Sequence, residues 1–279
     1  MIRHHRYSSL GAVARRNRSP FFLTLSAFAL SCLVLVAVSS TASAAFVQNY
    51  GSHNSPDLMY MDVTESNGGA TALFEAPSYS GNSIMFSPAN FLAQAIPGGA
   101  PVIVDSTIDT ILMADPNQVL NNIEIEEAGD HTLLGAPAGF ASASVGAAFF
   151  VTVLEINGSD ATGLGLPVLS QNLQVTTGAG PNGGSFSRPG DDGTATIWDG
   201  SVFIDLDAFL AANDVDGSVT KARLKWDNTL TAFADAQSGA FIKKKVVNGV
   251  VITTNVPEPT TCFLAAAGLL ACASMRRRS

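Results

Sequence analysis

The sequence lacks most of the residues on which small secreted domains and many enzymes depend. All three cysteines (Cys32, Cys262 and Cys272) lie near the ends, so residues 45–256 contain no thiol. That excludes disulfides and thiol catalysis from this stretch. Only two histidines, His53 and His131, remain there. With no Gly-x-Ser-x-Gly elbow and no His-Glu-x-x-His pattern, we expect a protein that is not an enzyme, and a hydrolase is the weakest alternative.

Basic residues are also scarce in the middle of the chain. Residues 45–256 hold seven of the 15 basic residues and 22 of the 23 acidic ones, a net charge of −15 (7 minus 22). A protein that binds a phosphate backbone needs a basic face, so we expect no nucleic-acid partner. An acidic surface favours solubility and attracts cations.

Each end of the chain contains a long uncharged, apolar run. Residues 1–20 carry five arginines and no acid, residues 21–38 are uncharged, and Ala42 and Ala44 flank Ser43 in a small-residue pattern. This order is typical of a signal peptide, so residues 1–44 are predicted to engage the export machinery and signal peptidase, with cleavage after Ala44. The alternative is an uncleaved membrane anchor.

The C-terminal end has three features in a fixed order: a proline-flanked acid, an uncharged apolar run over residues 262–275, and an arginine cluster. The arginines are expected to stay on the cytoplasmic side of a membrane. This tail resembles the PEP-CTERM sorting signal of bacterial surface proteins. The residues that carry the resemblance are Pro257, Glu258, Pro259, Arg276, Arg277 and Arg278.

The PEP-CTERM resemblance implies an exosortase-like processing enzyme and an association with bacteria that make exopolysaccharide. The apolar run has 14 residues, or about 21 Å as a helix, which is short for a bilayer core of about 30 Å. We therefore expect transient membrane anchoring, cleavage near Pro257–Pro259, and a mature protein at the cell surface or outside the cell. The predicted division is 1–44, 45–255 and 256–279.

The middle segment is predicted to be β-rich. Residues 219–226 alternate strictly, with Ala222, Leu224 and Trp226 on one face and Lys221, Arg223 and Lys225 on the other. Residues 123–127, 149–156 and 201–206 also read as strands. We expect one all-β domain, an antiparallel, jelly-roll-like β-sandwich, flanked by an N-terminal signal helix and a C-terminal membrane helix.

Several interruptions of these strands are also predicted. Asn157-Gly158 indicates a turn, and Asn248-Gly249 indicates a hairpin within residues 246–251, because Asn-Gly accepts positive φ angles. Gly129-Asp130 is expected to end a strand. Residues 207–212 are expected to form a short helix capped by Asp207, and residues 178–193 a loop.

Two stretches of the middle segment resemble sequence found in other PEP-CTERM surface proteins. One is residues 126–133; the other is residues 226–230 together with residues 239–245. The resemblance implies a shared extracellular β domain of unassigned activity, and it transfers no catalytic residues.

No cofactor is expected, with Ca²⁺ as the alternative. Asp214, Asp216 and Gly217 resemble the centre of an EF-hand-type loop, but its first and last ligand positions would be Ala212 and Arg223. A plain turn before the strand at Val219 explains the same residues. A site built from several loops, with Asp57, Asp62 or Asp227, is a further alternative.

The remaining candidate chemistry concerns carboxylates and tryptophans. Glu126 and Glu127 point to opposite strand faces, so they are not expected to act as a catalytic pair. Trp226 is expected in the core. Trp198 is the better candidate for an exposed, sugar-stacking ring, although a single tryptophan near a turn more often packs in the core or at an edge. Together these patterns predict an exported structural or interaction protein, with a calcium-dependent carbohydrate-binding module as the alternative.

Overall fold

The computed structural model describes residues 45–255, with side chains as far as Gly249. Within that range the chain is almost entirely β-strand, with one short α-helix and one 3-10 turn. The elements are β1 (Phe46–Asn54), β2 (Leu58–Asn67), β3 (Ser78–Ser80), β4 (Ser83–Phe86), β5 (Leu92–Ala95), β6 (Val102–Ala114), β7 (Gln118–Gly135), β8 (Ala141–Ile156), β9 (Ser159–Asp160), η1 (Thr162–Leu164), β10 (Leu169–Asn172), β11 (Gln174–Val175), β12 (Ser185–Ser187), β13 (Gly193–Asp205), α1 (Leu206–Ala212), β14 (Val219–Ala234) and β15 (Ser238–Asn255).

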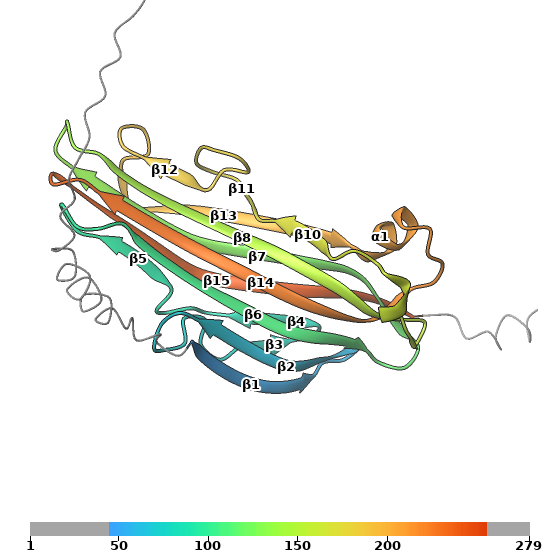
Figure 1. Cartoon of the computed structure of the whole chain (residues 1–279). Coiled ribbons are helices and arrows are strands. Elements are labelled where there is room, and N and C mark those ends of the chain that lie inside the picture. Colours follow the sequence, from blue (N-terminus) through green and yellow to red (C-terminus); the bar gives the residue numbers. More distant parts are fainter. Residues whose placement is uncertain (1–44, 256–279) are drawn as a thin grey trace, which may run out of the picture. The chain divides into compact units, whose positions relative to one another are not determined.

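The strands form two antiparallel ladders that pack face to face (Figure 1). The first ladder runs β1-β2-β6-β14-β8, and β9, β10 and β12 pair with β8. The second is centred on β13-β7-β15, with β4 and β5 on β15. A single residue pair, Val219 with Leu120, joins β14 to β7 and makes the two ladders one curled sheet.

Consecutive long strands alternate between the two ladders. The chain passes from β6 to β7, β8, β13, β14 and β15, and each step changes ladder. The buried faces of all these strands therefore meet in one shared core. The antiparallel β prediction is confirmed. The predicted signal and tail helices lie outside the described residues, and within residues 45–255 no helix is long and apolar enough to cross a membrane.

Strict alternation of inward-facing and outward-facing side chains explains most of β14. On β14 the side chains of Ala222, Leu224 and Trp226 are buried, whereas Arg223 and Lys225 are exposed. This is the pattern that the sequence predicts, and it continues to Ala234 because every second residue beyond Trp226 is also buried.

Two of the predicted interruptions are wrong. Asn248 and Gly249 lie inside β15, and Gly129 and Asp130 lie inside β7. Both glycines serve packing: a Cβ on Gly249 would lie 2.9 Å from Cζ2 of Trp226, and one on Gly129 would lie 2.6 Å from Cζ2 of Trp198. These strands therefore need glycine so that an indole ring can rest against the backbone.

The other local predictions are confirmed with two changes. Asn157 and Gly158 both have positive φ angles and form the turn between β8 and β9. Helix α1 forms, but its cap is Asp205, whose carboxylate accepts a hydrogen bond from the backbone N–H of Ala208 at 2.8 Å. The glycine-rich segment is mostly loop, yet it contains β12, whose Phe186 is buried.

Candidate functional sites

A buried polar cluster lies between the two ladders and consists of Lys244, Glu127 and Asn228. Their exposed fractions are 0%, 1% and 0%. Lys244 comes from β15, Glu127 from β7 and Asn228 from β14, so the two ladders meet at these side chains. The cluster also joins the two stretches that the sequence singles out, residues 126–133 and residues 226–230 with 239–245.

The cluster is held by direct contacts of the lysine. The Nζ atom of Lys244 donates a hydrogen bond to Oδ1 of Asn228 at 2.6 Å. It also forms an ion pair with Oε2 of Glu127. Among the described residues, Oε1 of Glu127 and Nδ2 of Asn228 have no hydrogen-bond partner. A buried polar atom without a partner costs free energy, so these two atoms need a physical explanation.

Aromatic rings wall the cluster off from water. Nζ of Lys244 lies 5.7 Å from the ring centroid of Phe91 and 5.8 Å from that of Trp198. Both rings are fully buried, as is Trp226, the next inward-facing residue before Asn228 on β14. An apolar surrounding of this kind strengthens electrostatic interactions and disfavours charge.

Burial moves the two ionisable groups toward their neutral forms. It raises the pKa of Glu127, although the nearby Lys244 opposes this. It lowers the pKa of Lys244, although Glu127 opposes that in turn. Both shifts favour transfer of the proton from the lysine to the carboxylate.

A second buried carboxylate, Glu65 of β2, has a very different environment. Its oxygens accept hydrogen bonds from the hydroxyls of Tyr50 at 2.6 Å and Ser106 at 2.9 Å. They also accept from the backbone N–H groups of Leu73 at 2.6 Å and Phe74 at 3.2 Å. Glu65 therefore fastens the segment that follows β2 to the edge of the first ladder.

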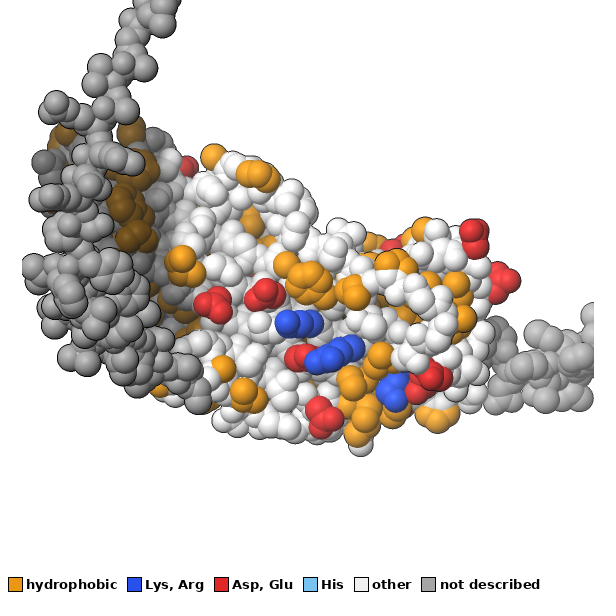
Figure 2. Space-filling model, viewed as in Figure 1, with side chains coloured by type: hydrophobic (Ala, Val, Ile, Leu, Met, Phe, Trp, Pro, Cys, Tyr) orange, Lys and Arg blue, Asp and Glu red, His pale blue; other side chains and the backbone are white. Residues whose placement is uncertain are grey.

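The outer face of β6, β14 and β8 carries a band of charged side chains. Figure 2 shows acidic and basic groups beside hydrophobic ones across this face. Arg223 binds Asp109 through both carboxylate oxygens, at 2.8 Å from Nε and 2.5 Å from Nη2. Lys221 pairs with Glu155 at 3.0 Å.

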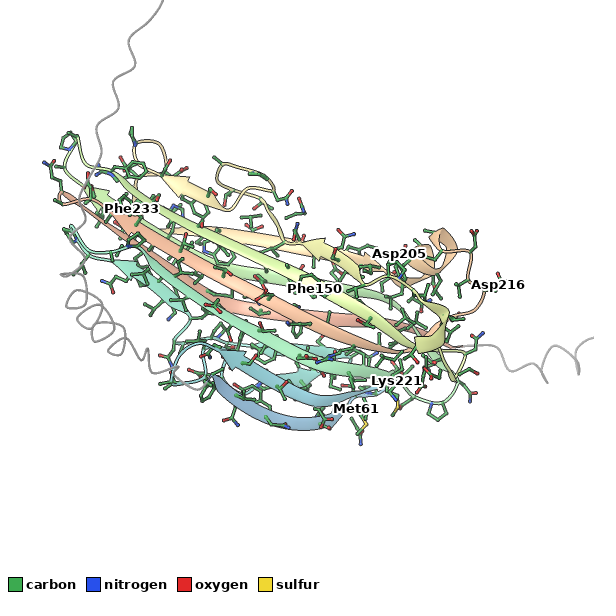
Figure 3. The ribbon with its side chains drawn as sticks, in the orientation of Figure 1. Met61, Phe150, Asp205, Asp216, Lys221 and Phe233 are labelled. Carbon is green, nitrogen blue, oxygen red and sulfur yellow. The ribbon has the colours of Figure 1, made fainter. Side chains whose placement is uncertain are left out.

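This outer face is hollowed in two places. A depression of about 370 Å³ is lined by Asp109, Phe150, Thr152, Val168, Arg223 and Lys225. A neighbouring one of about 320 Å³ lies where β8 and β14 meet the 172–183 segment, with Asn172, Asn182 and Asp227 on its wall. In Figure 3, Phe150 lies near the middle of this face and Phe233 near one end. A half-buried ring beside polar side chains can bind a small polar molecule.

The residues that the sequence predicts as calcium ligands, Asp214 and Asp216, line neither of these two depressions. Asp214 and Asp216 are exposed in the turn between α1 and β14, and Figure 3 labels Asp216 there. Ala212 is the last residue of α1, and Arg223 lies on β14 bound to Asp109. No group of three or more His, Cys, Asp or Glu side chains within residues 45–255 is arranged to hold a metal ion.

The remaining sequence candidates are largely structural. Trp198 and Trp226 are both fully buried, so core packing is confirmed for Trp226 and an exposed Trp198 is wrong. His131 stacks on Phe186 with ring centroids 4.0 Å apart, and burial lowers its pKa. Glu126 is exposed while Glu127 is buried, as strand alternation requires.

The buried lysine is the candidate site residue that sequence reasoning missed. Lys244 lies within a run of three lysines, and such a run usually marks a solvated surface. The signal was the alternation of Ala240, Ile242 and Lys244, which places the lysine on the inward face of β15. A β-bulge between Lys244 and Val246 then shifts the alternation, so that Val247 is the next buried residue.

Comparison with known proteins identifies the C-terminal tail. Residues 255–278 match the family model described as the PEP-CTERM protein-sorting motif. The chain carries a PEP-CTERM protein-sorting motif. Such a motif implies export to the cell surface, sorting through the C-terminus and processing by an exosortase-type enzyme. The residues predicted for sorting and for signal cleavage (Pro257, Glu258, Pro259, Arg276, Arg277, Arg278, Ala42 and Ala44) all lie outside the described residues.

Similarity to other proteins is weak for the β domain of this PEP-CTERM protein. No curated protein matches the chain. Among solved structures, the enzymatically active domain of bacteriophage CBA120 tailspike protein 4 aligns with a TM-score of 0.22 and 10% identity, covering 76% of this chain and 20% of that one. TmCBM61 in complex with beta-1,4-galactotriose aligns with a TM-score of 0.21 and 8% identity over 74% and 88% of the two chains.

A third solved structure, that of infectious bursal disease virus Gt strain, has a TM-score of 0.21 and 12% identity over 73% and 52% of the two chains. The PEP-CTERM protein thus spans a fifth of the tailspike chain and about half of the viral one. Likenesses at this level assign no function to its β domain.

Proposed function

We propose that this PEP-CTERM protein is a non-enzymatic structural or interaction protein of the bacterial surface or extracellular matrix. The observation that carries the proposal is the sorting motif at residues 255–278. A jelly-roll-like sandwich, whose consecutive strands alternate between two ladders, is the part presented outside the cell. A rigid core and a strongly acidic composition suit a protein that must persist in the matrix without disulfides.

The two ends of the chain supply the route in this proposal. The N-terminal leader is removed after Ala44 by signal peptidase, and the tail anchors the protein transiently in the membrane. The exosortase-type enzyme then cuts near Pro257–Pro259. Prolines disfavour a helix at the residues before them, which suits cleavage by a processing enzyme, and a short apolar run weakens retention in a bilayer.

The processing route is tested by two epitopes, one after Ser279 and one in the turn between β8 and β9. We expect mature protein to begin near Ala45 and to lack the C-terminal epitope. Replacing Pro257, Glu258 and Pro259 by alanine should leave both epitopes on membrane-bound protein. Wild-type protein that persists in the membrane with both epitopes would show that the tail is a permanent anchor.

A calcium-dependent carbohydrate-binding module is the second candidate, and the hollowed outer face supports the carbohydrate part of it. The half-buried ring of Phe150 lies beside Arg223, Lys225 and Asp109, which together offer stacking and hydrogen bonding to a sugar. A polysaccharide array should show binding that Phe150→Ala removes and Phe203→Ala, an exposed ring on β13, leaves unchanged. Absence of any binding would leave the structural role. A hydrolase, the weakest candidate, has no further support.

Calcium is tested separately. If Asp214 and Asp216 bind Ca²⁺, a chelator should lower the melting temperature of wild type but not that of Asp214→Asn/Asp216→Asn. A wild-type melting curve that ignores both chelator and added Ca²⁺ removes the ion from the proposal.

A further inference from the structure

We propose that Lys244 and Asn228 join through an intramolecular isopeptide bond, with Glu127 as the group that transfers the proton. The three side chains come from three strands, β15, β14 and β7, and meet in the core between the ladders. The bond would link β14 of the first ladder to β15 of the second. Such a cross-link supplies what the cysteine-free segment cannot obtain from disulfides.

The geometry brings the reacting atoms together. Nζ of Lys244 lies 2.6 Å from Oδ1 of Asn228. This oxygen is bonded to Cγ, the carbon that an amine attacks, so Nζ is within contact distance of its target. Reactions between groups held this close gain a large advantage over the same reaction in solution, because no entropy is lost in bringing them together.

The amide nitrogen of Asn228 is the leaving group. It has no hydrogen-bond partner in the described part of the chain, so no contact there has to be broken when it departs. The side chain of Asn228 is nevertheless fixed, because it is fully buried next to Trp226 on a strand paired on both sides with β6 and β8.

Glu127 is placed to make the amine reactive. An ammonium group has no lone pair, so Lys244 must first lose a proton, and Glu127 is in direct contact with Nζ. Complete burial of both groups, between walls that include Phe91 and Trp198, favours the neutral pair over the charged one. The same walls exclude water, which would otherwise compete for the amide carbon.

The reaction balances without any co-reactant. Glu127 takes one proton from the lysine ammonium, and the neutral Nζ attacks Cγ of Asn228 to give a tetrahedral intermediate. As the Cγ–Nδ2 bond breaks, the second Nζ proton passes through Glu127 to Nδ2, which leaves as ammonia. The products are the Nζ–Cγ amide, one ammonia molecule and protonated Glu127, so atoms and charge are conserved.

Mass spectrometry of the purified full chain tests the bond. The cross-linked protein should be lighter than its sequence by one ammonia molecule, about 17 Da. After tryptic digestion, residues 226–243 should remain joined to Lys244, and fragment ions should locate the bond at Asn228. A folded protein of unmodified mass overturns the proposal. So does the same mass loss with Asn228 found as a succinimide and no joined peptide.

Three variants separate the roles of the residues. Glu127→Gln keeps the shape of the side chain but cannot accept the proton, so folded Glu127→Gln should retain the unmodified mass. Asn228→Asp should lose water, about 18 Da, instead of ammonia. Lys245→Arg, next in sequence but exposed, should lose ammonia as wild type does. If the bond forms as fully in Glu127→Gln as in wild type, Glu127 has no part in the reaction. If a variant does not fold, the mass of the wild-type protein alone shows whether the bond is present.

Discussion

Glu65 and Glu127 are both buried carboxylates on inward strand faces, yet they differ in every partner. Glu65 receives hydrogen bonds from neutral donors, including Tyr50 and the backbone of Leu73, and both of its oxygens are used. Glu127 contacts the Lys244 side chain through one oxygen, while the other has no partner among the described residues. Burial alone therefore does not define what a carboxylate does.

The difference follows from what each strand faces. Glu65 lies on β2, close to the edge of its ladder, where the segment after the strand folds back and offers its N–H groups. Glu127 lies on β7, in the centre of the second ladder, where the opposite wall is the β14 face. A central position supplies side chains instead of free backbone groups, so a carboxylate there must be matched by another side chain.

The largest expected effect comes from removing the central carboxylate. Glu127→Ala leaves Lys244 buried without a counter-ion and without a proton acceptor, and we expect unfolding free energy to fall by at least about 3–5 kcal/mol. Unfolding in guanidinium chloride measures this loss of stability. Glu126→Ala, the exposed neighbour on the same strand, should change stability by less than about 0.5 kcal/mol. Equal costs at the two positions would contradict the burial of Glu127 beside Lys244.

The apolar wall beside the cluster is tested by its tryptophan. Trp226→Ala removes an indole that rests against Gly249 and Phe86, and it should cost about 3–5 kcal/mol. Lys225→Ala, one residue earlier on the exposed face, should cost little. Calorimetric melting of both variants makes the comparison, and equal tolerance would argue against the inward face assigned to β14.

A smaller effect is expected at the edge carboxylate. Glu65→Gln keeps an acceptor for Leu73 and Phe74 but turns one oxygen into a donor that faces the Tyr50 hydroxyl, so the cost should be about 1–3 kcal/mol. Hydrogen exchange should quicken at the N–H groups of Leu73 and Phe74 and stay slow at those of β14. Uniform loss of protection across the domain would mean that Glu65 supports the core and not only the edge.

The smallest effect concerns the tyrosine that contacts Glu65. Burial, and then the hydrogen bond to Glu65, raise the pKa of Tyr50 above its ordinary value of 10.0. A raised folded-state pKa stabilises the protein below about pH 10, and this contribution is lost as pH rises through that folded-state pKa. Tyr50→Phe should cost about 0.5–1.5 kcal/mol at neutral pH.

Unfolding measured across pH should show this Tyr50→Phe deficit shrinking above about pH 10. The reason is that wild type loses its contribution there, whereas phenylalanine has no proton to lose. A deficit that is constant from neutral pH upward would show that folding does not raise the pKa of Tyr50.

The two Asn-Gly pairs show where sequence patterns succeed and fail. Asn157-Gly158 forms the predicted turn because both residues take positive φ angles. Asn248-Gly249 is the same pair of residues, but here the glycine continues strand β15. The indole of Trp226 lies against the backbone of Gly249. The distinction depends on Trp226, which is 23 positions away in the sequence, so the local pattern contains no information about it.

The sequence by itself determined the class of this protein. Strict alternation predicted antiparallel strands and the inward Leu224 and Trp226, because a strand has a period of two whatever it packs against. The order of proline, acid, apolar run and arginines predicted the sorting tail, since that signal is local in the chain. Tertiary structure alone decided which polar residues share the core: Glu127, Asn228 and Lys244 are brought together by three strands, and a lysine in a charged run is buried only because another strand supplies its partner.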